Sequence, residues 1–496
     1  MTRRILHVAG EVQPLMKTGG LADAVAGLAG AHHHRGQQVH ILMPAYADTL
    51  SRFPDIEPEP GYQPPRGLEG TRLLRTRLPS SGVPVWLLEA PGFSNRPGNP
   101  YTDDSGQEQL DNDLRFARLS RVAVALAAGY ALRDWHAQVL HCHDWHAGMT
   151  PVYAMLQRLE AVQVFTIHNL GYDGRFPLSR MPGLQLPPWL WHPEALEFHD
   201  RLSFLKGGLA FSDAITTVSP TYAREIMRPD YGEGFQGLLR HRRDDLTGIL
   251  NGVDYQVWDP ETDIHLPYHY SRSRPGRKYM LRRALRKEFR LPNHRDVPLI
   301  CMVGRLVPQK GVDLVLDALS LLGDAPFQLI VLGSGDAEWE RRLEAAAEQW
   351  PEHMRVHVGY EEALAHRLIA GSDMLLMPSR FEPCGLVQLQ ALRYGTVPVV
   401  RETGGLADTV VDATPRNLRA GTATGIVFDA ATAGALAEAM RRAMELYSRK
   451  TLWWTLIRQA MRQDHSWSAS AGAYEMLYEE LLAEQASASR RIIGVD

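Results

Sequence analysis

Short apolar, β-branched runs alternate with longer stretches of helical spacing along most of the chain, and the whole pattern occurs twice. In the first half the apolar runs are residues 5–9, 39–43, 83–88, 139–141 and 164–167. In the second half they are residues 299–303, 328–332, 374–377, 397–400 and 426–428, and stretches such as 312–322 and 385–394 carry helical spacing. Continuous apolar runs between helices are typical of parallel strands covered on both faces. The sequence therefore predicts an α/β protein with two doubly wound, Rossmann-like domains.

Three segments follow from turn signals and composition. The turn "NGVD" ends the first domain, residues 1–251, and the second domain spans 252–465. Residues 255–275, rich in Asp, Pro, His and Tyr, are expected to connect the two. The terminal segment, 466–496, contains an amphipathic helix with apolar or aromatic side chains on one side: Tyr474, Leu477, Tyr478 and Leu481.

Charge and cysteine content exclude several classes of protein. The chain has 53 basic and 57 acidic residues and a formal charge of −4, which predicts no nucleic-acid partner and no anionic membrane surface. No apolar run is long enough for a secretory signal or a membrane span. The three cysteines, Cys142, Cys301 and Cys384, are too sparse for a disulfide scaffold and fit a reducing compartment. We expect a cytoplasmic protein.

Ligands of open α/β sheets bind beyond the carboxyl ends of the strands, so we expect the site in a cleft between the two domains. A cationic loop follows the first strand of each domain. The first contains Lys17 and a glycine pair before a helix, and the second contains Arg305 and Lys310. Such loops suit the charge of a leaving nucleoside diphosphate without a metal. The alternatives are a tight turn for the first loop and a solvated basic loop for the second.

Histidine-rich stretches leave two interpretations open. Residues 141–146 read "HCHDWH", which allows a zinc site, but no second Cys or His pair stands at the usual spacing. A strand end that contacts a sugar is the better alternative, because Asp, His and Trp suit hydroxyl bonding and stacking. The "HHH" at 32–34 is interpreted as an exposed helix end rather than a metal site. His168 ends the next strand and is either structural or in contact with substrate.

The most specific stretch is "SRFEPCGLVQ" at 379–388. Glu382 precedes a proline-anchored turn, and Gly385 is expected to open a helix. A carboxylate beside an anion site suits a reaction that builds positive charge at a sugar carbon as diphosphate leaves. The "TGGL" at 403–406 adds a helix N-terminus at the same edge. A surface glutamate before proline is the alternative.

Ten stretches resemble one family. They include "KTGGLADAVAGL" (17–28), "NRPGNPY" (95–101), "TIHNLGYDGRF" (166–176), "GRLVPQKGVDL" (304–314) and the run from "SRFEPCGL" to "GGLADTV" (379–410). In order and over nearly the whole chain, the sequence resembles bacterial glycogen synthases and plant starch synthases. These are retaining glycosyltransferases with the GT-B fold.

The resemblance implies ADP-glucose as donor in the interdomain cleft and an α-1,4-glucan such as glycogen or a maltooligosaccharide as acceptor, with no metal or other cofactor. It implies that the first domain is the acceptor side, that the second binds the nucleotide sugar, and that the final helix crosses back onto the first. Arg305 and Lys310 would hold the diphosphate, and Tyr360 would stack on the base. Glu382 and His168 would flank the glucosyl unit. The other implied donor residues are Lys17, Gly19, Gly20, Asp23, Asn169, Cys384, Gly385, Leu386, Thr403, Gly404 and Gly405, and the acceptor pocket would include Tyr101, Asp144 and Trp145.

Two departures and three alternatives accompany this resemblance. Gln390 stands where broader relatives with this fold carry a second glutamate, and Asp173 stands where the family is expected to carry Gln.

Retention of configuration can proceed through a covalent glucosyl-Glu382 or by front-side displacement, which we favour. A UDP-glucose-dependent enzyme, including one that makes sucrose- or trehalose-type products, is one rival. A non-catalytic glucan-binding protein is the other.

Overall fold

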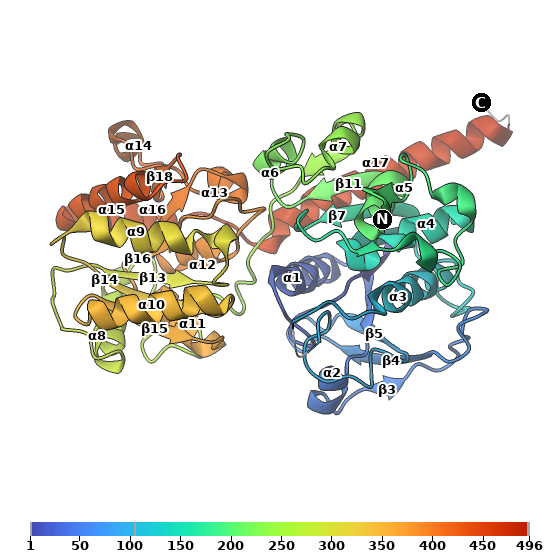
Figure 1. Cartoon of the computed structure of the whole chain (residues 1–496), viewed down its shortest axis with the longest axis horizontal. Coiled ribbons are helices and arrows are strands. Elements are labelled where there is room, and N and C mark those ends of the chain that lie inside the picture. The colour runs from blue at the N-terminus through green and yellow to red at the C-terminus, as the bar shows by residue number, and fades with distance from the viewer. Residues whose placement is uncertain (1, 104–105, 494–496) are drawn as a thin grey trace. The chain divides into compact units, whose positions relative to one another are not determined.

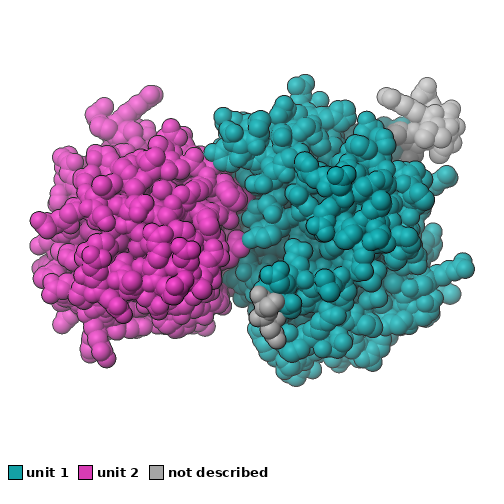
Figure 2. Space-filling model, viewed as in Figure 1, with its two compact units in different colours: residues 1–252, 467–496 teal, residues 253–466 magenta. Residues whose placement is uncertain are grey.

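The computed structural model describes residues 2–103 and 106–493, so residues 1 and 494–496 of the predicted first and terminal segments lie outside the described residues. The chain divides into two compact units (Figure 2). Unit 1 comprises residues 1–252 and 467–496, and unit 2 comprises residues 253–466. None of the described helices is long and apolar enough to cross a membrane.

Unit 1 is built on a mostly parallel sheet whose described strands lie in the order β12-β11-β7-β6-β1-β2-β5-β4-β3. The antiparallel partners are confined to one edge, where β4 pairs with β5 and β3 with β4. The strands are β1 (Arg4–Val8), β2 (Gln38–Pro44), β3 (Glu57–Pro58), β4 (Arg72–Arg77), β5 (Pro84–Glu89), β6 (Val139–His143), β7 (Val162–Ile167), β11 (Ala214–Thr217) and β12 (Leu246–Gly248). A small sheet, β8-β10-β9, is formed by β8 (Arg175–Phe176), β9 (Glu197–Phe198) and β10 (Arg201–Ser203).

Helices pack around this sheet (Figure 1). They are α1 (Gly20–His34), α2 (Ala47–Arg52), α3 (Asn112–Ala127), α4 (Met149–Leu156), α5 (Phe204–Phe211), α6 (Pro220–Glu225), α7 (Gln236–His241) and α17 (Trp467–Ile493), with 3-10 turns η1 (Trp145–Ala147), η2 (Leu178–Arg180) and η3 (Pro188–Leu190). The long helix α17 packs on α1, where the Trp467 indole lies directly over Gly27. Its buried Tyr474 and Tyr478 point into the centre of the unit, as the amphipathic pattern predicts.

Unit 2 contains a fully parallel sheet in the order β15-β14-β13-β16-β17-β18, with helices on both faces (Figure 1). The strands are β13 (Leu299–Val303), β14 (Gln328–Gly333), β15 (Met354–Val358), β16 (Met374–Met377), β17 (Val397–Arg401) and β18 (Ile426–Phe428). The helices are η4 (Pro275–Arg277), α8 (Lys278–Glu288), η5 (Pro308–Lys310), α9 (Val312–Leu322), α10 (Ala337–Gln349), α11 (Glu362–Gly371), α12 (Val387–Tyr394), α13 (Gly404–Thr409), α14 (Pro415–Ala420), α15 (Ala433–Ser448) and α16 (Lys450–Ala460).

Three local expectations differ from the structure. The segment 255–275 is no simple connection, because Leu266 and Tyr270 lie in the apolar core of unit 2. The helix expected from Gly385 begins at Val387, since Gly385 adopts a left-handed φ of +72° that a helix does not accept. His32 is fully buried rather than part of an exposed helix end.

Candidate active site

In unit 2, the candidate site residues are centred on Glu382, in the loop that follows β16. The carboxylate of Glu382 accepts hydrogen bonds from Lys310 Nζ at 2.5 Å and from Ser379 Oγ at 2.9 Å. Its side chain is only 7% exposed. Lys310 ends the 3-10 turn η5 in the loop after β13, so two neighbouring strands of the sheet each supply one partner. The structure thus joins two residues that are 72 positions apart in the sequence.

The glycine pair at 404–405 fits closely against the Glu382 loop. A Cβ atom on Gly404 would lie 2.0 Å from the Glu382 carbonyl oxygen, and one on Gly405 would lie 2.1 Å from the Cys384 carbonyl oxygen. Gly404 also has a positive φ of +44°. The N–H of Gly405 donates to the Glu382 carbonyl at 3.1 Å. These glycines therefore fix the position of the 382–384 loop, and this structural role does not depend on a ligand.

Two predicted donor residues lie at the same carboxyl edge of this sheet. Arg305 follows β13 and is exposed, and a Cβ atom on its neighbour Gly304 would meet no described atom within 4 Å. Tyr360 follows β15 and its side chain is 65% exposed. Helix α12 starts after Leu386 without a side-chain cap, so its first N–H groups are directed to this edge. Unit 2 thus places cations, a carboxylate, an aromatic ring and a helix N-terminus at one edge.

In unit 1, Lys17 and Asp23 form an ion pair of 2.8 Å across the start of α1. The N-cap of this helix, Gly19, has an extended backbone and no side-chain cap. A Cβ atom there would meet its nearest neighbour, a Glu11 carboxylate oxygen, only at 4.0 Å. Packing does not require glycine at position 19, so the space beside the helix N-terminus is open for an anion.

Glu11 is a further candidate for the site that no sequence motif indicates. It follows β1, is 2% exposed, and its carboxylate accepts a hydrogen bond from the Thr18 backbone N–H. Burial raises the pKa of Glu11 to about 7, against the lowering effect of the Thr18 bonds. Only its position at the carboxyl end of the first strand could have indicated a role.

Asp144 links the ends of β6 and β7. Its Oδ1 accepts a hydrogen bond from the His168 backbone N–H at 2.7 Å, and its own N–H donates to the Thr166 carbonyl at 3.0 Å. Asp144 has a positive φ of 54°, a strained conformation for a residue with a Cβ atom. Burial raises the pKa of its carboxyl group to about 7. The strain and the bonds together fix the backbone at His168 and Asn169.

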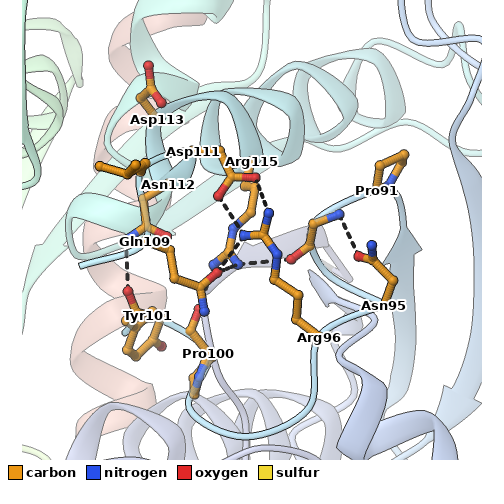
Figure 3. A network of polar contacts seen from close by, with 12 residues as sticks. Pro91, Asn95, Arg96, Pro100, Tyr101, Gln109, Asp111, Asn112, Asp113 and Arg115 are labelled. Carbon is orange, nitrogen blue, oxygen red and sulfur yellow. Dashed lines mark hydrogen bonds and ion pairs between the residues drawn. The ribbon is translucent and has the colours of Figure 1, made fainter. Parts of the chain in front are cut away.

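Tyr101 is held by a network of polar contacts that Figure 3 shows. Arg96 binds Asp111 through two hydrogen bonds of 2.6 and 2.9 Å. The carbonyl of Tyr101 accepts from the N–H of Gln109 at 3.1 Å and from the side chain of Asn112 at 3.0 Å. The Tyr101 hydroxyl is buried and has no hydrogen-bond partner among the described residues.

Trp145 lies beside this network but is part of the core. Its ring packs against Phe116 and His146, with centroids 4.9 and 4.2 Å apart, and the side chain is 7% exposed. A Cβ atom on Gly174 would lie 2.5 Å from the Trp145 ring. The indole therefore supports the strand end and does not offer a face for a pyranose.

A buried histidine cluster underlies the strand ends. His7, His141 and His143 place ligand-type atoms within 4.8 Å of one another, the arrangement that the zinc alternative needs. However, His141 already bonds Tyr478 and Thr166, and both ring nitrogens of His143 contact other histidines. Since hydrogen bonds occupy these nitrogens, the cluster is better described as a polar network than as a metal site.

Two α/β units, each built on a largely parallel sheet and each with a cationic loop and a helix N-terminus at the carboxyl edge of that sheet, are the features of the GT-B class of glycosyltransferases. A solved structure of the catalytic domain of starch synthase IV from Arabidopsis thaliana, bound to ADP and acarbose, has a TM-score of 0.88 and 31% identity over 97% of this chain and 100% of its own. The sucrose-phosphate synthase of Thermosynechococcus elongatus, with a TM-score of 0.59 and 18% identity over 97% of this chain and 100% of its own, is similar in fold alone.

The chain belongs to the glycogen synthase and starch synthase family. The family model described as "Starch synthase catalytic domain" matches residues 4–241, and "Glycosyl transferases group 1" matches residues 285–453. The glycogen synthase of Thioalkalivibrio sulfidiphilus is 51% identical over 97% of this chain and 100% of its own length. Glycogen synthase 1 of Methylococcus capsulatus is 49% identical over 97% of both chains.

Proposed function

We propose that the protein transfers glucose from ADP-glucose to the non-reducing end of an α-1,4-glucan with retention of configuration. The observation that carries this proposal is the Glu382 carboxylate, which accepts hydrogen bonds from Lys310 and Ser379. The glycine pair 404–405 packs closely against the backbone of the Glu382 loop and fixes its position. The glycogen synthases at about half identity over nearly the full chain support the choice of substrates.

In the proposed reaction, the bond between the glucosyl C1 and the β-phosphate oxygen of ADP breaks, and a bond from C1 to the acceptor hydroxyl oxygen forms. The departing phosphate takes the acceptor proton, so the products are ADP and a glucan longer by one unit. Arg305 and Lys310 stabilise the negative charge that develops on the diphosphate. Glu382 stabilises the positive charge that develops at the sugar carbon.

Roles for the other residues are assigned unit by unit. In unit 2, Tyr360 stacks on the base, and the 384–386 backbone with the start of α13 at 403–405 contacts the nucleotide. In unit 1, Lys17 and the start of α1 at 19–20 add positive potential, with Asp23 holding Lys17 in place. His168 and Asn169 contact the sugar, and Tyr101 and Asp144 belong to the acceptor pocket. The thiols of Cys142, Cys301 and Cys384 are buried and form no disulfide bond among the described residues, in keeping with a cytoplasmic enzyme.

The test is incubation with ADP-glucose and a maltooligosaccharide of defined length, followed by mass spectrometry and proton NMR of the products. A ladder of added hexoses with new α-linkages is expected. Extension with UDP-glucose but not ADP-glucose would overturn the donor. Tight glucan binding without extension by either donor would overturn the transferase activity. A glucosyl adduct trapped on Glu382 would replace front-side displacement by the covalent route.

A further inference from the structure

Three histidines in unit 1 form a continuous chain of ring contacts that leads from His168 into the core. His168 Nε2 lies 3.0 Å from His143 Nδ1, and His143 Nε2 lies 3.0 Å from His7 Nδ1. His7 is in β1, His143 ends β6, and His168 directly follows β7, so the chain crosses three adjacent strands. His7 and His143 are completely buried, with at most 1% of their surface exposed.

The protons of such a chain must all point in one direction. Burial lowers the pKa of His7, His143 and His168 well below the usual value, so all three rings are neutral at pH 7. A neutral imidazole has one N–H donor and one acceptor nitrogen. If His143 accepts from His7, it must donate to His168; if it accepts from His168, it must donate to His7. The three hydrogen-bonded histidines therefore have only two ordered arrangements of their protons.

The inner end of the chain distinguishes these two arrangements. His7 Nε2 is buried and has no hydrogen-bond partner among the described residues. If the protons point inward, from His168 toward His7, this nitrogen carries an N–H group that has no acceptor. If they point outward, from His7 toward His168, this nitrogen is only an unused acceptor. Orphaned buried N–H groups are rarer in proteins than under-used acceptors, so the outward arrangement is favoured.

In the outward arrangement, the Nδ1–H of His7 donates to His143, and the Nδ1–H of His143 donates to Nε2 of His168. The remaining proton of His168 is then on Nδ1. We propose that His143 and His7 are positioning residues that hold His168 in the Nδ1–H tautomer, so that His168 donates a hydrogen bond to an oxygen atom of the bound sugar. This inference rests on the proposed function for the identity of the ligand.

The wrong tautomer of His168 is expected to slow turnover. A histidine with its proton on the other nitrogen would direct a lone pair at the sugar oxygen, which removes the hydrogen bond and adds repulsion. In catalytic triads, loss of the residue that sets the histidine tautomer lowers the rate severely although the fold is kept. His143 therefore affects turnover through His168, without contact with the substrate.

The cluster also supplies a matched control. His141, whose ring stacks on His143 with centroids 4.2 Å apart, bonds Tyr478 at 2.7 Å and Thr166 at 2.6 Å. It does not join the 168–143–7 chain. Tyr478→Phe removes a buried hydrogen bond from the same cluster and the same region of the core, but leaves the proton order at His168 unchanged.

The first experiment is nitrogen-15 NMR of the ligand-free protein with labelled histidine, in which the two ring nitrogens of each tautomer have distinct shifts. Loss of signals in His168→Gln identifies the His168 ring. We expect Nδ1 of His168 to be protonated in the wild type and in Tyr478→Phe, and a mixture of tautomers in His143→Leu. Protonation at Nε2 in the wild type would overturn the inference, whether or not the protein synthesises glucan.

The second experiment is steady-state kinetics with ADP-glucose and a maltooligosaccharide. His143→Leu is expected to lower kcat by about ten-fold or more, the order found for residues that bind the second ring nitrogen of a metal-ligating histidine and so orient it. His143→Asn, whose amide can still donate to His168, is expected to recover part of the loss. Wild-type kcat in His143→Leu, or an equal loss in Tyr478→Phe, would contradict the positioning role. A wild type that is inactive with ADP-glucose would instead contradict the proposed function.

Discussion

The ammonium group of Lys310 lies 2.5 Å from a carboxylate oxygen of Glu382, and both side chains are largely withdrawn from solvent. This contact joins the loops that follow two adjacent strands, β13 and β16. A charge-assisted hydrogen bond of this kind fixes the carboxylate more firmly than a neutral bond would. Glu382 is thus held in place before any ligand binds, as a group that stabilises developing charge must be.

Glu382→Gln is expected to lower kcat about 10²- to 10³-fold, because the amide fills the same space but cannot stabilise positive charge. The KM for ADP-glucose should change little. Glu344→Gln, at an exposed position on α10, is the control and should behave as the wild type. A Glu382→Gln enzyme within about ten-fold of wild-type kcat would exclude the role assigned to this carboxylate.

Gly27→Ala is expected to displace α17 from unit 1. The added Cβ would lie 1.9 Å from the Trp467 indole nitrogen, closer than any normal contact. We expect a loss of about 1–3 kcal/mol in the free energy of unfolding, as for other overpacked sites. Gly434→Ala on α15 is the matched control, since a Cβ there meets no described atom within 4 Å. Urea unfolding followed by tryptophan fluorescence measures both. Equal stability of the two variants would contradict the close packing of Trp467 on Gly27.

Glu11→Gln should make the stability of unit 1 less sensitive to a rise in pH between pH 4.5 and about 7. Burial raises the pKa of Glu11 from 4.5 to about 7, so the folded state holds a proton that the unfolded chain has lost between these pH values. That stabilisation is fully present below pH 4.5 and is lost as the pH rises through about 7. Glutamine cannot ionise, and the variant should gain up to about 3 kcal/mol relative to the wild type as the pH rises through this interval. Thermal midpoints at pH 5 and pH 8 test this; a difference between variant and wild type that does not grow with pH would contradict it.

Acid should destabilise unit 1 through its buried histidines. Burial lowers the pKa of His32 to about 4 and of His168 to about 3, and those of His7, His141 and His143 also lie well below 6.5. The unfolded chain binds protons that the folded unit does not, so stability is present above pH 6.5 and is lost as the pH falls toward these values.

Hydrogen exchange at pH 7 and pH 5, corrected for the intrinsic exchange rate, measures this effect peptide by peptide. Strands β1 and β6 of unit 1 should lose protection, while β13 and β14 of unit 2 serve as the internal reference. His32→Phe should reduce the pH dependence of the free energy of unfolding by about 1.4 kcal/mol per pH unit below pH 6.5, which is the contribution of one proton. Unchanged protection of β1 at pH 5 would show that the cluster is not neutral as described.

Much of the parallel core could be predicted from the sequence. The strands at 299–303, 374–377 and 426–428 and the helix at 312–322 have the predicted bounds, because buried parallel strands are continuous apolar runs between helices. The antiparallel strands beyond β5 were missed. Strand β4, which lies between β5 and the edge strand β3, reads "RLLRTR", and its charged residues hide the strand from a search for apolar runs.

The candidate site was predictable only where a motif carries its own chemistry. Glu382, Lys310 and Arg305 stand in loops whose composition indicates an anion site. The contact between Lys310 and Glu382 depends on strand order, which the sequence does not display. The burial of His32 depends on α17, more than 400 residues further along the chain, whose Tyr478 ring lies 5.5 Å from the His32 ring. For the same reason, the ring chain from His7 to His168 has no signal in the sequence.

ADP release from ADP-glucose in the presence of a chelator, with and without a maltooligosaccharide, tests glucosyl transfer directly when the wild type is compared with Glu382→Gln. We predict release that requires the glucan, persists with the chelator and is about 10²- to 10³-fold slower in Glu382→Gln. Release that does not depend on the glucan, or that stays within about ten-fold of the wild-type rate in Glu382→Gln, would contradict the glucosyl transfer that we assign to this site.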